Sequence, residues 1–244
     1  DGEPRMTPAV SCLMPVYNAR RFLAEAIRSI LDQTFTDFEL IVIDDGSTDG
    51  SSRIIDDLAR DDSRIVVMHQ ANTGIVGALN NGLKAVRGRY VARMDADDIS
   101  LPDRFMRQVR YLDDTPGCVL VGGHARIVRD DGEDIGRTTG GRHLKTDLTV
   151  FPPRISVSMH PLIMVRAEAM KAVGGYRPDY PHAEDYDLFI RLSAFGSIDN
   201  PDFDCLRYRR HDSAVSVRHV EVQEAAAARA EVDAIIRARG SVPP

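Results

Sequence analysis

The chain has 244 residues, a net charge of −6 and three cysteines, and these numbers exclude several classes of protein. Hydrophobic residues make up 43% and charged residues 28% of the sequence, which is typical of a soluble globular protein and not of a disordered or fibrous one. A nucleic-acid-binding surface normally needs a clustered basic excess, so the acidic balance argues against a nucleic-acid partner.

The cysteines Cys12, Cys118 and Cys205 show no C-x-x-C spacing. Neither a disulfide framework nor a thiolate zinc site is indicated, and we expect three small core residues in a cytoplasmic protein. No stretch approaches the roughly 20 apolar residues that span a bilayer, and the first residues lack the hydrophobic segment of a signal peptide. We expect Met6 to be the native first residue, with residues 1–5 foreign to the natural chain.

Strand and helix patterns alternate in the first 98 residues. Strands are predicted at residues 9–14, 39–43, 65–68 and 90–94. An amphipathic helix is predicted after each of the first three strands, with Asn18 as the cap of the first helix and Ile75 on the inward side of the third. Such alternation predicts an α/β fold with a mostly parallel central sheet and helices on both faces.

The regular alternation of strand and helix patterns ends in the second half of the chain. A helix is expected to open at Ser100 and Pro102, and residues 118–121 and 125–128 with a turn at 130–132 predict a small antiparallel or mixed sheet. The segment from Gly136 to Arg154 has no clean period, and we expect a mobile loop of the kind that often serves as a lid. Further helices are predicted at 166–173 and 184–195, and short strands at 197–198 and 205–208.

The last predicted helix is rich in alanine and covers residues 220–239. Its apolar stripe is expected to pack on the domain, with a partner interface as the alternative. A homodimer is among the expected assemblies of the chain. The stripe consists of Val222, Ala225, Val232, Ile235 and Ile236. We expect a single domain over residues 1–244, with a nucleotide-binding half (9–98), an acceptor-binding half (99–218) and this C-terminal helix (219–239).

Three groups of carboxylates follow predicted strands or open a predicted helix. They are Asp44 and Asp45, then Asp95, Asp97 and Asp98, and finally Glu184, Asp185 and Asp187. Ligands of parallel sheets bind beyond the carboxyl ends of the strands, so the first two groups could share a cleft. Acidic turns also often only end a strand or cap a helix, and for the third group capping at the positive end of the helix dipole explains the residues equally well.

Carboxylates at such an edge suit transfer chemistry on a nucleotide-activated substrate. A diphosphate leaving group gains negative charge as its bond breaks, and Mg²⁺ or Mn²⁺ held by one or two carboxylates neutralises that charge. A further carboxylate on the other face of the reacting carbon can take the proton from an incoming hydroxyl.

Seven motifs in their order along the chain resemble family 2 glycosyltransferases of the GT-A fold. They are MPVYN at 14–18, LIVIDDGSTD at 40–49, NTG at 72–74, ARMDADD at 92–98, HP at 160–161, GGY at 174–176 and AEDYDL at 183–188. Each motif is weak alone, but the ordered set, which extends from about residue 10 to about residue 216, is specific.

The resemblance implies an inverting hexosyltransferase that uses Mn²⁺ or Mg²⁺ and moves a sugar from a nucleoside-diphosphate sugar, with a UDP-sugar favoured, to a hydroxyl acceptor. Carbohydrate, lipid-linked and small-molecule acceptors all fit, and a lipid-linked acceptor would require peripheral contact with the inner face of the membrane. Polysaccharide biosynthesis is the expected context. The donor sugar is not readable, because sugar selectivity depends on the shape of the pocket.

The resemblance also assigns roles to residues. Asp185 would be the general base with Glu184 as its acidic partner, Asp97 would ligate the metal directly, and Asp95 and His211 would complete the metal site. Asp98 is interpreted as structural. The nucleotide-binding residues would be Pro15, Val16, Tyr17, Asn18, Asp44, Asp45, Asn72, Gly74, Asp95 and Ala96.

One residue departs from the pattern of the family. Leu79 stands where many relatives carry an arginine, which leaves the source of positive charge for the diphosphate open. Arg93 is one candidate. The basic residues Arg137, Arg142 and Lys145 of the Gly136 to Arg154 loop are the other.

Two other functions share part of this pattern. A sugar-phosphate nucleotidyltransferase also uses metal-bound aspartates, but it normally needs a glycine-rich loop directly after the first strand, where this chain has Pro15 to Asn18. A non-catalytic domain that binds a sugar or a metal is the second alternative. Hydrolysis of a UDP-sugar would separate the enzyme from a binding domain.

Overall fold

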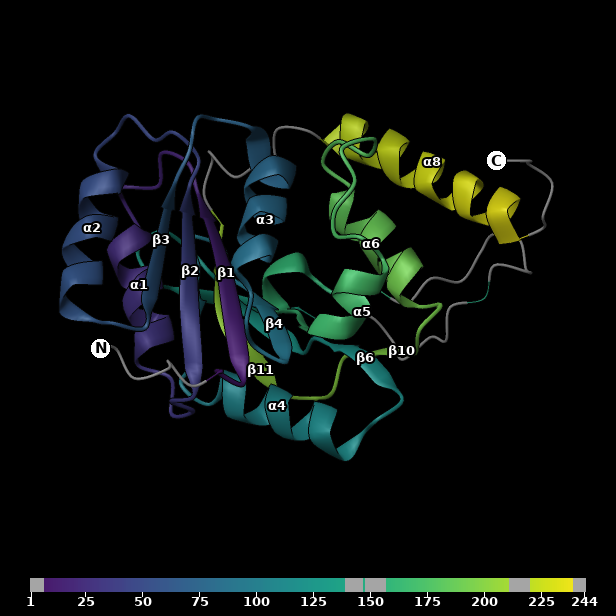
Figure 1. Cartoon of the computed structure of the whole chain (residues 1–244), viewed down its shortest axis with the longest axis horizontal. Helices are drawn as coiled ribbons and strands as arrows, with labels where there is room; N and C mark the ends of the chain where they lie inside the picture. The colour runs from purple at the N-terminus through teal and green to yellow at the C-terminus, as the bar shows by residue number, and fades with distance from the viewer. Residues whose placement is uncertain (1–6, 139–146, 148–156, 211–219, 239–244) are drawn as a thin grey trace.

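The computed structural model describes residues 7–138, 147, 157–210 and 220–238, which form two sheets and the helices around them (Figure 1). The strands of the main sheet are β1 (Val10–Val16), β2 (Phe38–Asp44), β3 (Ile65–His69), β4 (Tyr90–Arg93), β6 (Cys118–Val121), β9 (Met164–Arg166) and β10 (Ser197–Asp199). The second sheet contains β5 (Ile99–Ser100), β7 (His124–Val128), β8 (Asp134–Arg137) and β11 (Asp204–Arg209).

The main sheet has the strand order β10-β6-β9-β4-β1-β2-β3. Strand β1 pairs in parallel with β2 and β4, β2 with β3, and β6 with β10, whereas β9 is antiparallel to both of its neighbours. The second sheet, in the order β5-β11-β7-β8, mixes one parallel with two antiparallel pairs. The predicted architecture of a mostly parallel sheet and a small mixed sheet is therefore confirmed.

Helices cover both faces of the main sheet. They are α1 (Leu23–Leu31), α2 (Ser51–Asp61), α3 (Gly74–Ala85), α4 (Arg104–Asp114), α5 (Ala167–Ala172), α6 (Glu184–Leu192) and α8 (Val220–Ala238), with a 3₁₀ turn at His160–Leu162. Successive side chains of a strand point to opposite faces. Cys12 and Met14 accordingly pack in one cluster with α1, α2 and α4, and Leu13 packs in the other with α3, α5 and α6.

Strand β1 continues through Pro15 to Val16, two residues beyond the predicted end at residue 14. The register of β1 with β4 ends at Leu13, whereas its pairing with β2 extends from Val10 to Val16. A proline fits a strand where its missing N–H faces a side that makes no ladder bond. The strand therefore delivers Val16 and Tyr17 directly to the carboxyl edge of the sheet.

Two predictions about the first helices are wrong. Asn18 does not cap α1, because its backbone is left-handed (φ 52°) and its Oδ1 accepts a hydrogen bond from the backbone N–H of Thr48 at 2.8 Å. Ile75 is 38% exposed, whereas Ala78, Leu79 and Gly82 form the buried side of α3. A Cβ at Gly82 would lie 2.7 Å from Ile43, so the helix packs tightly on β2.

The second half differs from the prediction in its boundaries. Ser100 belongs to β5 and α4 begins at Arg104. The hairpin around Gly132 joins β7 to β8, but residues 118–121 enter the main sheet as β6. Strand β9, three residues long, was missed because so short a segment has no readable period. Most of the Gly136 to Arg154 loop lies outside the described residues.

Helix α8 packs beside α6, which confirms the expected contact with the rest of the chain (Figure 1). Its predicted inward stripe is wrong, because Val222 and Val232 are 46% and 53% exposed. The buried side consists of Ala226, Ala230 and Ala234. In the described residues, no helix combines the length and apolar character needed to cross a bilayer.

Candidate active site

Asp95, Asp97 and Asp98 form a cluster directly after β4, with one carboxylate oxygen from each lying within 4.8 Å of the others. Asp98 is 1% exposed, and its Oδ1 accepts a hydrogen bond from the backbone N–H of Arg209 at 2.8 Å. Among the described residues, its Oδ2 has no hydrogen-bond partner. Burial and the neighbouring charges of Asp95 and Asp97 hold the pKa of Asp98 well above its usual range.

The cluster fits a divalent metal ion. Carboxylate oxygens are the hard ligands that Mg²⁺ and Mn²⁺ prefer, and an unpartnered buried oxygen at Asp98 is a group that a cation would satisfy. Asp98, which is interpreted as structural from the sequence, has its carboxylate in the same cluster.

Arg93 places a buried positive charge next to Asp95 of this cluster. Its side chain is 4% exposed and forms an ion pair with Asp95. Burial lowers the pKa of this guanidinium, but the charge and hydrogen bond of Asp95 and the charge of Asp98 outweigh that effect and raise it. This burial argues against Arg93 as a diphosphate contact. Of the other candidates, Arg137 is ion-paired with Asp202 and Asp204, while Arg142 and Lys145 lie outside the described residues.

The first turn of α6 presents three carboxylates in three environments. Glu184 is 6% exposed, and burial raises its pKa. Asp185 is half-buried and its Oδ1 accepts a hydrogen bond from the N–H of Tyr186 at 2.8 Å. Burial and then the charge of Glu184 raise the pKa of Asp185 to about 6. Asp187 is 1% exposed and paired with Arg191 at 2.6 Å, so it is structural.

Electrostatic coupling connects the α6 turn with the cluster after β4. The charge of Arg93 lowers the pKa of both Glu184 and Asp185, and the charge of Asp95 raises the pKa of Glu184. A group that loses a proton near neutral pH is suited to general base catalysis, because it is deprotonated yet still basic at the working pH. The α6 turn therefore carries a carboxylate suited to take a proton, and it is electrostatically coupled to the cluster after β4.

His160 and Tyr176, from the HP and GGY motifs, form a buried pair in which His160 Nε2 lies 2.8 Å from the Tyr176 hydroxyl. Burial and the charge of Arg93 hold the pKa of His160 well below its usual range, so the ring is neutral. Burial raises the pKa of Tyr176, the charge of Arg93 opposes that rise, and the charges of Asp185 and Glu184 add to it. The motifs pointed to these residues, but only the structure shows that they contact one another and are coupled to the charge of Arg93.

The predicted nucleotide-binding residues lie at the ends of β1 and β2, on the loops that follow β1 to β4, and at the start of α3. Val16 is 1% exposed and Tyr17 is 56% exposed. The backbone N–H of Asn18 donates to the Ser47 hydroxyl at 3.0 Å, which ties the loop after β1 to the loop after β2. Pro15, Asn72, Gly74 and Ala96 also lie in these loops or at the strand ends, and Ala96 is 8% exposed.

Asp44 and Asp45 connect these loops to one another. The carboxylate of Asp45 accepts hydrogen bonds from the backbone N–H groups of Thr73 at 2.8 Å and Gly74 at 2.9 Å, at the start of α3. Asp44 accepts one from the Ser47 N–H at 3.0 Å and lies 3.0 Å from His69 Nδ1. Although burial opposes it, hydrogen bonds, led by those from Ser47 and Ser52, lower the pKa of Asp44.

Gly46 allows the loops after β2 and β3 to approach closely. Its φ is +77°, and a Cβ would lie 2.9 Å from the backbone nitrogen of Asn72. Only glycine combines that backbone conformation with that space. Contact of Asp44 and Asp45 with the base of a nucleotide stays a prediction. The predicted metal ligand His211 lies outside the described residues.

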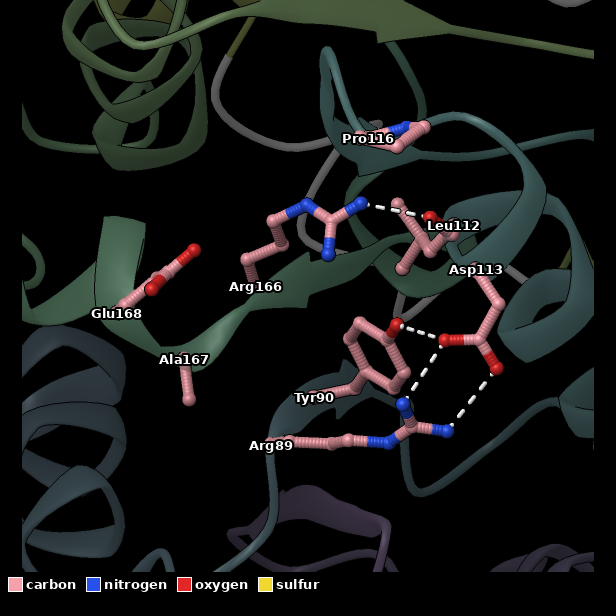
Figure 2. Close-up of a pocket in the computed structure, with 8 residues that line it drawn as sticks. All are labelled: Arg89, Tyr90, Leu112, Asp113, Pro116, Arg166, Ala167 and Glu168. Carbon is pink, nitrogen blue, oxygen red and sulfur yellow. Dashed lines mark hydrogen bonds and ion pairs between the residues drawn. The ribbon is translucent and has the colours of Figure 1, made fainter.

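A pocket of about 370 Å³ lies at the start of β4, at the opposite end of the strand from Asp95 (Figure 2). Arg89 binds the carboxylate of Asp113 through two contacts of 2.9 and 3.0 Å, and the Tyr90 hydroxyl donates to the same carboxylate at 2.6 Å. Arg166 donates to the backbone oxygen of Leu112 at 2.6 Å. Arg89, Tyr90 and Asp113 are thus engaged with one another, and Arg166 with the backbone.

Comparison with known proteins agrees with this geometry. A family model described as glycosyl transferase family 2 matches residues 11–174. A relative described as an uncharacterized glycosyltransferase of Haemophilus influenzae is 30% identical over 223 residues, which cover 86% of this chain and 68% of the relative.

Two solved structures share the fold. The mannosyltransferase PcManGT from Pyrobaculum calidifontis, in complex with GDP-Man and Mn²⁺, has a TM-score of 0.70 at 18% identity over 96% of this chain and 66% of that chain. Staphylococcus aureus TarS 1-349, in complex with UDP-GlcNAc, has a TM-score of 0.69 at 20% identity over 84% of this chain and 59% of that chain. At such identities the likeness shows the GT-A fold, and the family match shows the enzyme class. The chain belongs to glycosyl transferase family 2.

Proposed function

We propose that this chain is an inverting, divalent-metal-dependent glycosyltransferase that moves a sugar from a nucleoside-diphosphate sugar to an acceptor hydroxyl, with Asp185 as the general base. One observation carries the proposal. A cluster of metal-type carboxylates after β4 and a half-buried carboxylate with a pKa of about 6 on α6 are both coupled to the buried charge of Arg93. The cluster after β4 would support the leaving group, and the first turn of α6 would activate the nucleophile.

The cluster would hold Mn²⁺ or Mg²⁺. Asp97 is the proposed direct ligand, and Asp95 would contact the ribose or the ion through water. The unpartnered Oδ2 of Asp98 supports a share in the same site. When bound, the ion would neutralise the negative charge of the diphosphate leaving group.

The carboxylate of Asp185 would take the proton of the acceptor hydroxyl as the hydroxyl oxygen bonds to the anomeric carbon. Attack from the face opposite the departing diphosphate inverts that carbon. Glu184 supports this role because its charge raises the pKa of Asp185. Tyr17, with its 56% exposed side chain at the end of β1, would offer its ring to the nucleotide base.

A UDP-sugar is the favoured donor, since one structural neighbour was solved with UDP-GlcNAc, although another was solved with GDP-Man. The chain spans about two thirds or less of these relatives, so the acceptor of the whole protein belongs to the proposal as well. A carbohydrate, a lipid-linked sugar or a small molecule would each supply the hydroxyl.

The experiment that tests the function starts with a thermal-shift panel of UDP-, GDP- and dTDP-sugars with Mn²⁺. The sugar nucleotide that shifts the melting temperature most is then assayed for release of its nucleoside diphosphate, with water as the acceptor. We expect Asp185→Asn to keep nucleotide binding and to lose about 10²-fold or more in turnover. Asp179→Asn, the same change at an exposed carboxylate six residues before Asp185, is the control.

The outcomes separate the alternatives. Turnover of Asp185→Asn that equals the wild type contradicts the general base. Pyrophosphate release from a nucleoside triphosphate and a sugar phosphate would indicate a nucleotidyltransferase. Binding of the sugar nucleotide with no release of nucleoside diphosphate would indicate a binding domain.

A further inference from the structure

We propose that α8 is a positioning element for the catalytic turn of α6, in which Glu231 and Asp233 fix Asp185 in place through Tyr186 and Tyr180. The inference rests on the proposed role of Asp185. Neither Glu231 nor Asp233 needs to touch the substrate, so both are positioning residues.

Two hydrogen bonds connect the turn to α8, one on each side of Asp185 in the sequence. The hydroxyl of Tyr186, the residue after Asp185, donates to Glu231 Oε1 at 2.5 Å. The hydroxyl of Tyr180, five residues before Asp185, donates to Asp233 Oδ2 at 2.8 Å. Charge-assisted hydrogen bonds of this kind are about twice as strong as neutral ones. The turn that carries the base is therefore held from α8 on both sides.

The packing between α8 and α6 is close because the contacting residues are small. Ala226, Ala230 and Ala234 follow one another at a spacing of four and lie buried on the same side of α8. They form one cluster with Tyr180, Ala183 and Ile190. Ala183 directly precedes Glu184, so the alanine side of α8 supports the start of α6.

The chain enters α6 through a strained turn. The N–H of Ala183 donates to the backbone oxygen of Tyr180 at 3.0 Å, which closes a turn over Pro181 and His182. His182 has a left-handed backbone, with a φ of 61°. This is the pattern of a type II turn, in which the third position normally favours glycine. A non-glycine residue keeps such a conformation only where its surroundings fix it, and the bond from Tyr180 to Asp233 fixes the first residue of this turn.

The carboxylate of Asp185 depends on this geometry through one backbone bond. Its Oδ1 accepts from the N–H of Tyr186 at 2.8 Å, so the backbone of Tyr186 orients the carboxylate. If the hydrogen bond between the Tyr186 hydroxyl and Glu231 is lost, the N–H of Tyr186 and the carboxylate of Asp185 shift together. A displacement of about 1 Å costs about 10²-fold in rate when a reacting group must be aligned. The loops after β1, β2 and β3 keep their own hydrogen bonds, so donor binding should be spared.

The test uses Tyr186→Phe, which deletes the hydroxyl, and Glu231→Ala, which deletes the acceptor. The probe is the sugar nucleotide selected by the thermal-shift panel, with Mn²⁺, and the readouts are kcat, KM for the donor and the pH dependence of kcat/KM. We expect kcat to fall by about 10- to 100-fold with KM within about twofold. Glu231→Gln keeps an acceptor oxygen and should recover most of the activity. Glu224→Ala, at an exposed position of α8, is the matched control and should equal the wild type.

A double variant distinguishes positioning from general loss of structure. If Tyr186 acts through Asp185, adding Tyr186→Phe to Asp185→Asn should cost less than about twofold further, because residues that act as a unit are not additive. An additive loss, or wild-type kcat in both Tyr186→Phe and Glu231→Ala, overturns the positioning role while leaving Asp185 as the base. Full activity of Asp185→Asn overturns the proposed base, and the positioning role with it.

Discussion

The buried guanidinium of Arg93 forms an ion pair with the carboxylate of Asp95, two residues further along the chain, at the point where β4 ends. Burial raises the pKa of Glu184 and Asp185 on α6, and the charge of Arg93 offsets part of that rise. The same charge adds to the effect of burial in lowering the pKa of the His160 ring. One buried cation therefore influences both the proposed metal ligands and the proposed base. The consequence is that a change at Arg93 should alter stability and pH dependence together.

We expect Arg93→Met to lower the free energy of unfolding by about 3 kcal/mol, because breaking a buried pair leaves uncompensated charge. In the same variant the pKa of Asp185 should rise, since Arg93 lowers it in the wild type. A base works when deprotonated, so the acidic limb of kcat/KM should move to higher pH. Urea denaturation and a pH–rate profile provide the two measurements.

Arg89→Met is the matched control for Arg93→Met. Arg89 is ion-paired with Asp113 at 2.9 Å, but its side chain is 56% exposed and lies at the other end of β4 (Figure 2). Exposed pairs contribute about 0 to 1 kcal/mol. Equal losses of stability in the two variants, or an unmoved acidic limb in Arg93→Met, would contradict the central role of Arg93.

Asp97→Asn should have opposite effects with and without metal. After burial and the charge of Asp95, repulsion from Asp97 is a cause of the raised pKa of Asp98. Removing that charge should therefore stabilise the metal-free protein in EDTA by about 1 kcal/mol. The gain in melting temperature on adding Mn²⁺ should disappear. The measurement is thermal unfolding in EDTA and in Mn²⁺, with Asp113→Asn as the control. A Mn²⁺-dependent shift that survives in Asp97→Asn would remove this residue from the metal site.

The alternation of strands and helices was predictable because apolar periodicity is local. The strands at 39–43 and 65–68 and the helix at 184–195 appear with boundaries changed by a few residues. Local patterns could not show that β9 inserts antiparallel between β4 and β6, because three residues carry no period and their pairing partners are distant in sequence.

The site was predictable as a set of carboxylates, but the way they are held was not. The ordered motifs indicated Asp97 and Asp185. Nothing in the sequence showed that Asp98 is buried with an unpartnered oxygen, or that the guanidinium of Arg93 is buried and ion-paired with Asp95. The inward side of α8 was missed for a related reason. A hydrophobicity pattern favours valine and isoleucine, whereas close packing on α6 selects the small residues Ala226, Ala230 and Ala234.

His69 should make stability depend on pH near neutrality. Its Nε2 lies 2.9 Å from Asp56 and its Nδ1 lies 3.0 Å from Asp44, and these carboxylates raise the pKa of the ring, Asp56 most. A raised pKa means that the folded state favours the protonated ring. The stabilisation is therefore complete below the unfolded pKa of about 6.5 and is lost as the pH rises through the folded value.

His69→Gln tests this linkage. Because the ring is 46% exposed, the loss of stability at pH 5.5 should stay below about 1 kcal/mol, and it should vanish at pH 9. Urea denaturation at both pH values measures the difference. A difference between wild type and His69→Gln that is the same at both pH values would show that the ring contributes packing and not charge.

Ala230→Leu should separate α8 from α6. Ala230 is 1% exposed in the cluster with Tyr180, Ala183 and Ile190, so the added carbon atoms have no room. Overpacking of this kind costs about 1 to 3 kcal/mol. Ala228→Leu, two residues earlier on the exposed side of the same helix, should stay within about 0.5 kcal/mol of the wild type. Urea denaturation of both variants gives the comparison. Equal stability of the two would mean that α8 does not hold the close contact on which the support of Asp185 depends.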